Sequence, residues 1–269
     1  MSSPATPRAG IMQPSDRRGI VVFADFDGTL VSIADRPEDV IVPPGLSTDL
    51  AGLAERLHGA LAVVTGRPIE AIDRFLAPGR FAVAGGHGTE RRRPDGSMLM
   101  PDTALQAASA RIGARLRPFA QGEPRLALEI KIAAVSLHFR QAPELEAVCR
   151  EAMEAALEDE PLFTIIAGKM VFEAKPAALN KGTAAAAFLV EPPFAGRAPL
   201  FVGDDRTDED GFAIAQAQGG LGIKVGAGET MARHRLPSPS AVLELFDALG
   251  DDGRLGNISA VEAFLDGKG

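Results

Sequence analysis

The sequence contains no tryptophan, no tyrosine and a single cysteine, Cys149, in 269 residues. One cysteine excludes a disulfide framework and a cysteine-based zinc site, and it suits a reducing compartment. Stacking on a nucleobase or a sugar ring would have to use phenylalanine or histidine. No run of residues approaches the ~18 apolar positions that span a bilayer. We therefore expect a cytoplasmic protein with no membrane segment.

Positive charge is also scarce, with 28 Lys and Arg against 36 Asp and Glu, for a net charge of −8. An acidic surface repels phosphate backbones and anionic lipid, so we expect neither nucleic acid nor a membrane as partner. A local cluster of lysine and metal could still bind a small phosphorylated ligand. Residues 1–18 are rich in Pro, Ser and Arg and lack an apolar stretch, which predicts a flexible leader and not a secretion signal.

Short apolar runs alternate with helical patterns through much of the chain, which is typical of strand–helix–strand units around a parallel sheet. The expected buried strands are 19–24, 60–64, 80–84, 198–202 and 221–225. The middle of the chain differs, because paired strands and two helices follow one another there. We predict an α/β fold: a Rossmann-like parallel-sheet core over 19–102 and 175–269, with an inserted α+β cap domain over 103–174.

The cap is expected to contain helices over 103–119 and 142–157 and strands over 125–130, 134–139, 162–167 and 170–174. Apolar residues of the second helix recur at i, i+3 and i+4, the spacing of a helix with one buried face. The residues expected on that face are Leu145, Val148, Cys149, Ala152, Met153, Ala156 and Leu157.

Two of the expected strands run directly into acidic loops. Asp25-Phe26-Asp27-Gly28-Thr29 follows the first strand, and Gly203-Asp204-Asp205-Arg206-Thr207-Asp208 follows the fourth. Ligands of open parallel sheets bind beyond the carboxyl ends of the strands, where these loops would meet. Two acidic clusters at one edge repel each other unless a cation lies between them, and oxygen ligands without His or Cys favour Mg²⁺ together with substrate phosphate. A turn with helix-capping carboxylates would explain either cluster alone, but two clusters in this context favour a phosphoryl site.

The first acidic loop resembles the first motif of the haloacid dehalogenase superfamily, and Thr65, Lys181 and the loop 203–208 match its second, third and fourth motifs in order. The closer resemblance is to the trehalose-phosphate phosphatases. It runs from about residue 19 to about residue 250 and is carried by Gly86-His87-Gly88-Thr89-Glu90, Glu129-x-Lys131, Ser136-Leu137-His138-Phe139-Arg140, Gly168-Lys169-Met170-Val171-Phe172-Glu173, Asn180-Lys181-Gly182 and the second acidic loop.

The resemblance implies a hydrolase core and an Mg²⁺-dependent phosphatase of trehalose biosynthesis that converts the sugar phosphate trehalose 6-phosphate to trehalose and phosphate. In that chemistry Asp25 attacks phosphorus and forms an aspartyl-phosphate. Asp27 gives its proton to the departing sugar oxygen and then takes one from water. The metal is expected to contact Asp25, the main-chain carbonyl of Asp27, Asp204 and either Asp208 or Asp205, of which we favour Asp208.

Two further residues are expected at the phosphoryl group by the same resemblance. Thr65 would hydrogen-bond a phosphoryl oxygen, although a helix N-cap before Pro68 explains it equally well. Lys181 would offset charge in the transition state; the alternative for this residue is a solvated lysine in the first turn of a helix.

For the oligomeric state we expect a monomer.

The inserted module is expected to bind the sugar. A disaccharide presents many hydroxyls, and residues two apart on a strand share a face. By resemblance the contacts fall to Glu129, Lys131, Arg140, Lys169 and Glu173, and we add Arg67, His87 and His138 as substrate-binding candidates. Cross-strand ion pairing on a solvated face is the alternative for each strand pair, and His138 equally fits a structural histidine.

Other functions remain open on the residues alone. A related sugar-phosphate phosphatase of the sucrose or mannosylglycerate type, or a phosphomutase, would share the aspartyl-phosphate chemistry. A signalling receiver is a further alternative, but it needs neither an inserted module nor a second aspartate two residues after the first. Both features of this sequence therefore argue against a receiver. The sequence has no Gly-x-Ser-x-Gly, no His-Glu-x-x-His and no P-loop motif, which argues against the corresponding hydrolases and nucleotidases.

Overall fold

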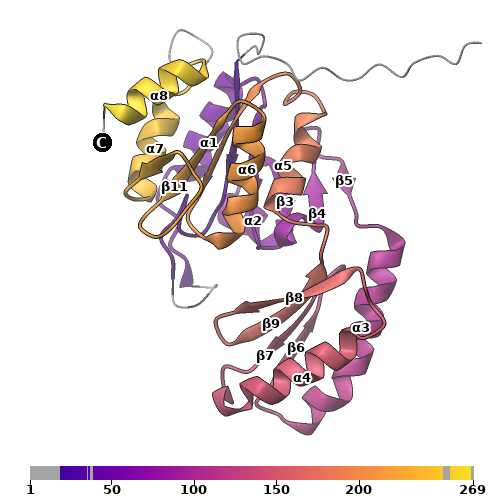
Figure 1. Cartoon of the computed structure of the whole chain (residues 1–269). Coiled ribbons are helices and arrows are strands. Elements are labelled where there is room, and N and C mark those ends of the chain that lie inside the picture. The colour runs from indigo at the N-terminus through magenta and orange to yellow at the C-terminus, as the bar shows by residue number, and fades with distance from the viewer. Residues whose placement is uncertain (1–18, 35, 37–38, 251–254, 268–269) are drawn as a thin grey trace, which may run out of the picture. The chain divides into compact units, whose positions relative to one another are not determined.

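The structure is a computed structural model that describes residues 19–34, 36, 39–250 and 255–267 (Figure 1). The leader expected over 1–18 lies outside these residues. The chain divides into two compact units: unit 1 comprises Met1–Val63 with Ala185–Gly269, and unit 2 comprises Val64–Ala184. Within the described part of the chain, no helix combines the length and the apolar character needed to cross a membrane.

Unit 1 is built on a parallel sheet with the strand order β12-β11-β10-β1-β2. Its strands are β1 (Ile20–Ala24), β2 (Leu61–Val64), β10 (Ala198–Gly203), β11 (Leu221–Val225) and β12 (His234–Leu236). Every residue of the first four is buried. Burial on both faces explains why these strands are unbroken apolar runs in the sequence.

The helices of unit 1 are α1 (Leu46–Arg56), α6 (Glu209–Ala217), α7 (Pro239–Ala248), α8 (Ile258–Asp266), the end of α5 (Lys181–Leu189) and the short 3-10 turn η5 (Arg206–Asp208). Of these, α1 and α6 lie beside the sheet in Figure 1. Helix α1 buries Leu46, Leu50 and Leu53, which lie four and three residues apart on one face. The last residue of α1, Arg56, donates from Nε and Nη2 to the carbonyl oxygens of Leu249 and Phe246, both at 2.9 Å, at the end of α7.

Unit 2 begins with α2 (Ile69–Phe75), β3 (Ala82–Gly85), the 3-10 turn η3 (Gly86–Gly88), β4 (Glu90–Arg92) and β5 (Met98–Leu99). Strand β4 pairs antiparallel with both β3 and β5. The sequence predicted β3, but neither β4 nor β5, because charged residues and a Pro-Asp-Gly turn interrupt any apolar pattern there.

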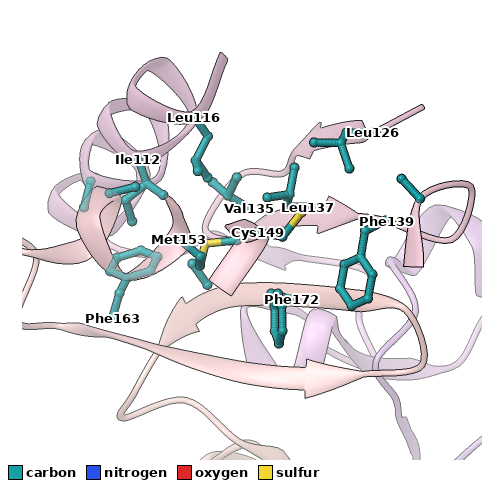
Figure 2. Packing of buried hydrophobic residues seen from close by; sticks show 14 residues of the cluster. Ile112, Leu116, Leu126, Val135, Leu137, Phe139, Cys149, Met153, Phe163 and Phe172 are labelled. Atoms are coloured by element: carbon teal, nitrogen blue, oxygen red, sulfur yellow. The ribbon is translucent and has the colours of Figure 1, made fainter. Parts of the chain in front are cut away.

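The rest of unit 2 contains α3 (Thr103–Gly122), β6 (Ala127–Ile130), β7 (Val135–His138), the turn η4 (Pro143–Leu145), α4 (Glu146–Leu157), β8 (Phe163–Gly168) and β9 (Val171–Pro176). The four strands form an antiparallel sheet in the order β6-β7-β9-β8. Figure 2 shows the core between this sheet and its helices, where Ile112, Met153 and Phe172 are fully or almost fully buried. The prediction of a mostly parallel α/β sheet with a separate α+β segment is confirmed.

The limits of the two units differ from those expected for the core and the cap. Unit 2 holds the whole of 103–174 and also 64–102 and 175–184. The division of the chain into a catalytic core and a cap at residues 103 and 174 stays a prediction.

The buried face expected for the helix after residue 142 is correct at its centre and wrong at one edge. Cys149, Met153 and Ala156 are buried, whereas Val148 is 46% exposed. Successive residues turn by about 100° around a helix, so Cys149, Met153 and Ala156 fall on one narrow stripe and Val148 lies to its side.

Candidate active site

Three carboxylates meet at the carboxyl end of the parallel sheet of unit 1. Asp25 follows β1 directly and its N–H donates to the carbonyl of Val202 on β10, at 2.9 Å. One carboxylate oxygen from each of Asp25, Asp204 and Asp208 lies within 4.8 Å of the other two. We call these three residues the acid cluster. Because β1 and β10 are parallel neighbours, the two acidic loops leave the sheet at the same edge, as the sequence predicted.

The cluster depends on a glycine. Gly28 has a φ of +74°, and a Cβ added there would lie 2.1 Å from Oδ2 of Asp204. The turn is closed by the N–H groups of Leu30 and Val31, which donate to the carbonyl of Phe26. A side chain at position 28 would therefore occupy the space that the Asp204 carboxylate fills.

Asp208, and not Asp205, belongs to the acid cluster. Asp208 is fully buried, and its Oδ2 accepts the N–H groups of Asp204 and Asp205 at 3.0 and 3.1 Å. Asp205 is exposed, and its Oδ1 accepts the N–H and the hydroxyl of Thr207. Its carboxylate therefore caps the 3-10 turn η5.

Asp27 is half-buried in the turn after β1, and its carboxylate is outside the group of three. The roles expected for Asp27, as proton donor and through its main-chain carbonyl, stay predictions.

A buried lysine that the sequence did not single out lies beside the acid cluster. Lys224 on β11 is 5% exposed, and its Nζ donates to the main-chain carbonyl of Asp204 and to that of Val225. The only signal was a lysine inside an apolar strand, Leu221-Gly222-Ile223-Lys224-Val225. Such a lysine must bury its ammonium group unless the strand lies at an edge.

The donor set of the acid cluster fits a hard divalent cation. Three carboxylates held this close, two of them buried, repel one another unless a cation or protons offset their charge. All the donors are oxygen, the type that Mg²⁺ takes, and no sulfur or imidazole competes in the group. The neighbouring Thr29 is also fully buried, and within the described residues its hydroxyl has no hydrogen-bond partner.

In unit 2, two loops expected at the site are interlocked by main-chain hydrogen bonds. The N–H of His87 donates to the carbonyl of Thr65, and the N–H of Gly86 to that of Arg67, both at 3.0 Å. The hydroxyl of Thr65 accepts the N–H of Arg67 at 3.2 Å, whereas the N-cap of α2 is Pro68, so Thr65 is not the cap. The backbone of His87 is left-handed, with a φ of 54°.

The side chains of these loops are held by local packing. The ring of His87 lies so close to Gly66 that a Cβ there would meet Nε2 at 2.6 Å. The guanidinium of Arg67 lies over the ring of Phe75, 4.9 Å from its centroid. The two candidate substrate residues are therefore oriented by a glycine and an aromatic ring.

Lys181 is the first residue of α5 and is 2% exposed. The helix start is fixed by a reciprocal pair, since the N–H of Thr183 donates to Oδ1 of Asn180 and the N–H of Asn180 donates to Oγ1 of Thr183. Upstream, the buried Lys175 donates from Nζ to the carbonyl of Leu179. The segment that carries Lys181 is thus fixed on both sides.

One face of the four-stranded sheet of unit 2 carries the charged residues expected to read the sugar. Glu129, Ser136 and Glu173 are paired across β6, β7 and β9 and lie on the face opposite the core. Lys131 Nζ is 2.7 Å from Oε2 of Glu173 and 3.9 Å from Oε2 of Glu129, and His138 Nε2 is 3.5 Å from Oε2 of Glu129. We call these five residues the polar face.

Glu173 is the most strongly held carboxylate of the polar face. Burial alone would raise its pKa, but the charge of Lys131 and the hydrogen bonds from Lys131 and Ser136 outweigh burial and hold the pKa below its usual value. Ser136 was not among the expected contacts. It is 1% exposed, and its hydroxyl donates to Oε2 of Glu173 at 2.8 Å.

Two of the expected sugar contacts lie apart from this network. Arg140 is exposed in the turn after β7, and Lys169 is exposed in the two-residue turn between β8 and β9. Alternation along a strand would put Arg140 on the face of His138, and Lys169 on the face of Glu173. Both Arg140 and Lys169 lie beyond the ends of their strands.

The comparisons with known proteins agree on one family. Residues 23–240 match the family model described as trehalose-phosphatase. A protein of Sinorhizobium fredii named "Probable trehalose-phosphate phosphatase" is 42% identical over 233 residues, covering 85% of this chain and 86% of its own. The trehalose-6-phosphate phosphatase of Escherichia coli is 40% identical over 217 residues, covering 80% of each chain.

Solved structures with a similar fold include a member named for the same activity. A crystal structure titled trehalose-6-phosphate phosphatase related protein matches with a TM-score of 0.70 and 28% identity, over 84% of this chain and 95% of that one. A haloacid dehalogenase-like hydrolase from B. subtilis matches with a TM-score of 0.56 over 84% of this chain and 98% of that one, and its 15% identity supports the fold alone. The family match over most of the chain and the two relatives at 40% identity or more show that this chain belongs to the trehalose-phosphatase family.

Proposed function

We propose that this chain is a phosphatase that hydrolyses trehalose 6-phosphate to trehalose and phosphate in trehalose biosynthesis. The observation that carries the proposal is the acid cluster of Asp25, Asp204 and Asp208, in a chain whose family model and relatives are named for this activity. A phosphatase of this kind needs a nucleophile and a way to neutralise the charge of a phosphate ester. The acid cluster offers a carboxylate as the nucleophile and carboxylate ligands for a cation that neutralises the charge.

The acid cluster is proposed to hold Mg²⁺ through the carboxylates of Asp25, Asp204 and Asp208 and the main-chain carbonyl of Asp27. When bound, the ion would neutralise charge on the phosphoryl oxygens. Asp208 is well suited as a ligand because two main-chain N–H groups fix its Oδ2.

Asp25 is proposed as the nucleophile. A carboxylate oxygen of Asp25 forms a bond to phosphorus, and the bond between phosphorus and the sugar oxygen breaks. Asp27, protonated at this stage, gives its proton to the departing oxygen, so trehalose leaves as a neutral alcohol.

In the second step Asp27 takes a proton from water as the water oxygen attacks the aspartyl-phosphate. The bond between phosphorus and Asp25 breaks, phosphate is released, and Asp25 returns as a carboxylate. The two residues are separated by one position, which suits a nucleophile and a proton carrier that act in sequence on one group.

For the residues of unit 2 we propose the roles implied by their family motifs. The hydroxyl of Thr65 and the ammonium of Lys181 would bind phosphoryl oxygens. The polar face would bind sugar hydroxyls, because carboxylates and an ammonium group held by one another offer acceptors and donors in a fixed pattern. Arg67, His87, Arg140 and Lys169 are proposed as further substrate contacts.

The test is phosphate release in Mg²⁺ and then in EDTA, with trehalose 6-phosphate, sucrose 6-phosphate, glucose 6-phosphate and mannosyl-3-phosphoglycerate. Release from trehalose 6-phosphate alone, abolished by EDTA, is expected. Release from another of these sugars would keep the chemistry and refute the substrate, whereas no release from any would favour a phosphomutase. The Asp25→Asn variant should fold normally and release no phosphate, and turnover by that variant would refute the nucleophile.

A further inference from the structure

The main chain of Asp204 is held by hydrogen bonds on both sides of its α-carbon. Its N–H donates to Oδ2 of Asp208 at 3.0 Å, and its carbonyl accepts from Nζ of Lys224. The first hydrogen bond comes from η5, four residues along the chain, and the second comes from β11, twenty residues away. The two peptide groups that flank a residue set its φ and ψ, and these in turn set the direction of its Cα–Cβ bond.

Lys224 is placed for this contact by the strand register. Gly203 on β10 pairs with Lys224 on β11, so the lysine side chain starts beside the last residue before Asp204. The second acceptor of Nζ is the carbonyl of Val225, at 2.8 Å. Among the described residues, both of these acceptors of the ammonium group are main-chain carbonyls.

A buried lysine in a strand is costly unless its hydrogen bonds repay the loss of water. A methionine or leucine would fill the same volume of β11 without that cost. Stability of the sheet therefore does not explain the residue, whereas the contact with Asp204 does.

We propose that Lys224 is a positioning residue for the acid cluster: by binding the main-chain carbonyl of Asp204, it directs the Asp204 carboxylate toward Asp25 and Asp208, where a cation would bind. The inference rests on the proposed metal site. The Asp204 carboxylate has little freedom on its other side, because it packs against Gly28. Lys224 on one side and Gly28 on the other define a single position for it.

Removing Lys224 should change cation affinity differently for each role that the lysine could have. If the lysine acts only through its positive charge, its loss makes the cluster more negative and tightens cation binding. If it positions Asp204, its loss weakens binding, because hard cations need their ligands in a fixed geometry. A purely structural role would lower stability and leave the affinity unchanged.

The experiment uses Mn²⁺ as a probe of the carboxylate site, in full-length protein stripped with EDTA and without substrate. Bound and free Mn²⁺ are separated by electron paramagnetic resonance, and folding is checked by circular dichroism and urea unfolding. For Lys224→Met we expect the dissociation constant to rise about 10-fold or more, the range seen when a residue supporting a metal ligand is lost.

The control is Arg56→Met, which also removes a cation bonded to two main-chain carbonyls in unit 1, but at the end of α7. It should lose stability and bind Mn²⁺ as the wild type does. If Lys224→Met does not fold, Lys224→Gln decides, because it removes the charge and keeps an N–H donor. Its dissociation constant should rise by a smaller factor.

Wild-type or tighter binding by the folded Lys224 variant overturns the positioning role. Equal weakening in Arg56→Met overturns it as well, because the loss would then follow stability and not position. If the wild type itself binds no Mn²⁺, the proposed metal site fails together with the inference.

Discussion

Replacing Gly28 by alanine tests whether the acid cluster is assembled by steric fit. The new Cβ would lie 2.1 Å from Oδ2 and 2.3 Å from Cγ of Asp204. Carbon–oxygen contacts settle at about 3.3 Å, so the carboxylate has to retreat by about 1 Å. Mg²⁺ requires its ligands within a few tenths of an ångström of about 2.1 Å. The shifted Asp204 can no longer bind together with Asp25 and Asp208.

The substitution also carries a backbone cost that has nothing to do with the cluster. A non-glycine residue in the left-handed region costs about 1–2 kcal/mol. Gly196→Ala isolates this cost, because Gly196 has nearly the same φ, +76° against +74°, and its added Cβ would meet nothing within 4 Å. In EDTA, Gly196→Ala should therefore lose about 1–2 kcal/mol of unfolding free energy, and Gly28→Ala should lose at least as much because of its added contact with Asp204.

The two variants should separate when Mg²⁺ is titrated into the stripped proteins by calorimetry. Gly196→Ala should bind like the wild type, whereas Gly28→Ala should bind at least about 10-fold more weakly, the loss typical of disturbing even an indirect support of a metal ligand. Phosphate release should fall in parallel. Wild-type Mg²⁺ affinity in a folded Gly28→Ala protein would refute the argument, because Asp204 would then not need the space at position 28.

Three further predictions follow from single contacts. Asp208→Asn should weaken Mg²⁺ binding about 10-fold or more, while Asp205→Asn should leave it nearly unchanged; similar losses in both would mean that the whole loop, and not Asp208, supports the cation. Thr29→Val should raise the unfolding free energy by about 1 kcal/mol in urea titrations, because it removes a buried hydroxyl without a partner in the described structure; a loss of that size would reveal a partner. Because the pKa of Glu173 is lowered by Lys131 in the folded state, ionised Glu173 stabilises the protein above the ordinary glutamate pKa of about 4.3, and this contribution disappears as the pH falls through the lowered value. Unfolding free energies measured from pH 7 to pH 3 should therefore drop less in Glu173→Gln than in the wild type, and parallel curves would contradict the assignment.

The parallel sheet could be predicted because β1, β2, β10 and β11 are buried on both faces. Unbroken apolar runs of five or six residues such as Ile20–Ala24 and Ala198–Gly203 are typical of interior strands, and the loops that follow them carry the acidic residues. The short strands Glu90–Arg92 and His234–Leu236 were missed because they lack such a run. Both are partly exposed and only three residues long, so their sequences show no period.

The candidate site was predictable where function depends on residue type and less so where it depends on contacts. Asp25 and Asp204 stand out because closely spaced acidic residues directly follow two buried strands. Lys224 and Ser136 each contact a residue that lies elsewhere in the chain. A single residue in a strand gives no information about the register that brings it to Asp204 or Glu173. The boundary between the two compact units was also hidden, since it falls inside strand β2 and helix α5, with no loop to mark it.

The antiparallel sheet of unit 2 has an apolar face, which packs in the core, and a polar face, which carries the charged groups. Side chains alternate along each strand, so Phe172 and Leu137 face the core in Figure 2, while their neighbours Glu173 and Ser136 face the other way. A slip of one residue by β9 would bury Glu173 and expose Phe172, so correct folding also sets the order of the charged groups. If the polar face binds the sugar as proposed, the exposed Glu129 and the half-buried His138 can be varied to change its ligand without disturbing the core residues on the other side of the sheet.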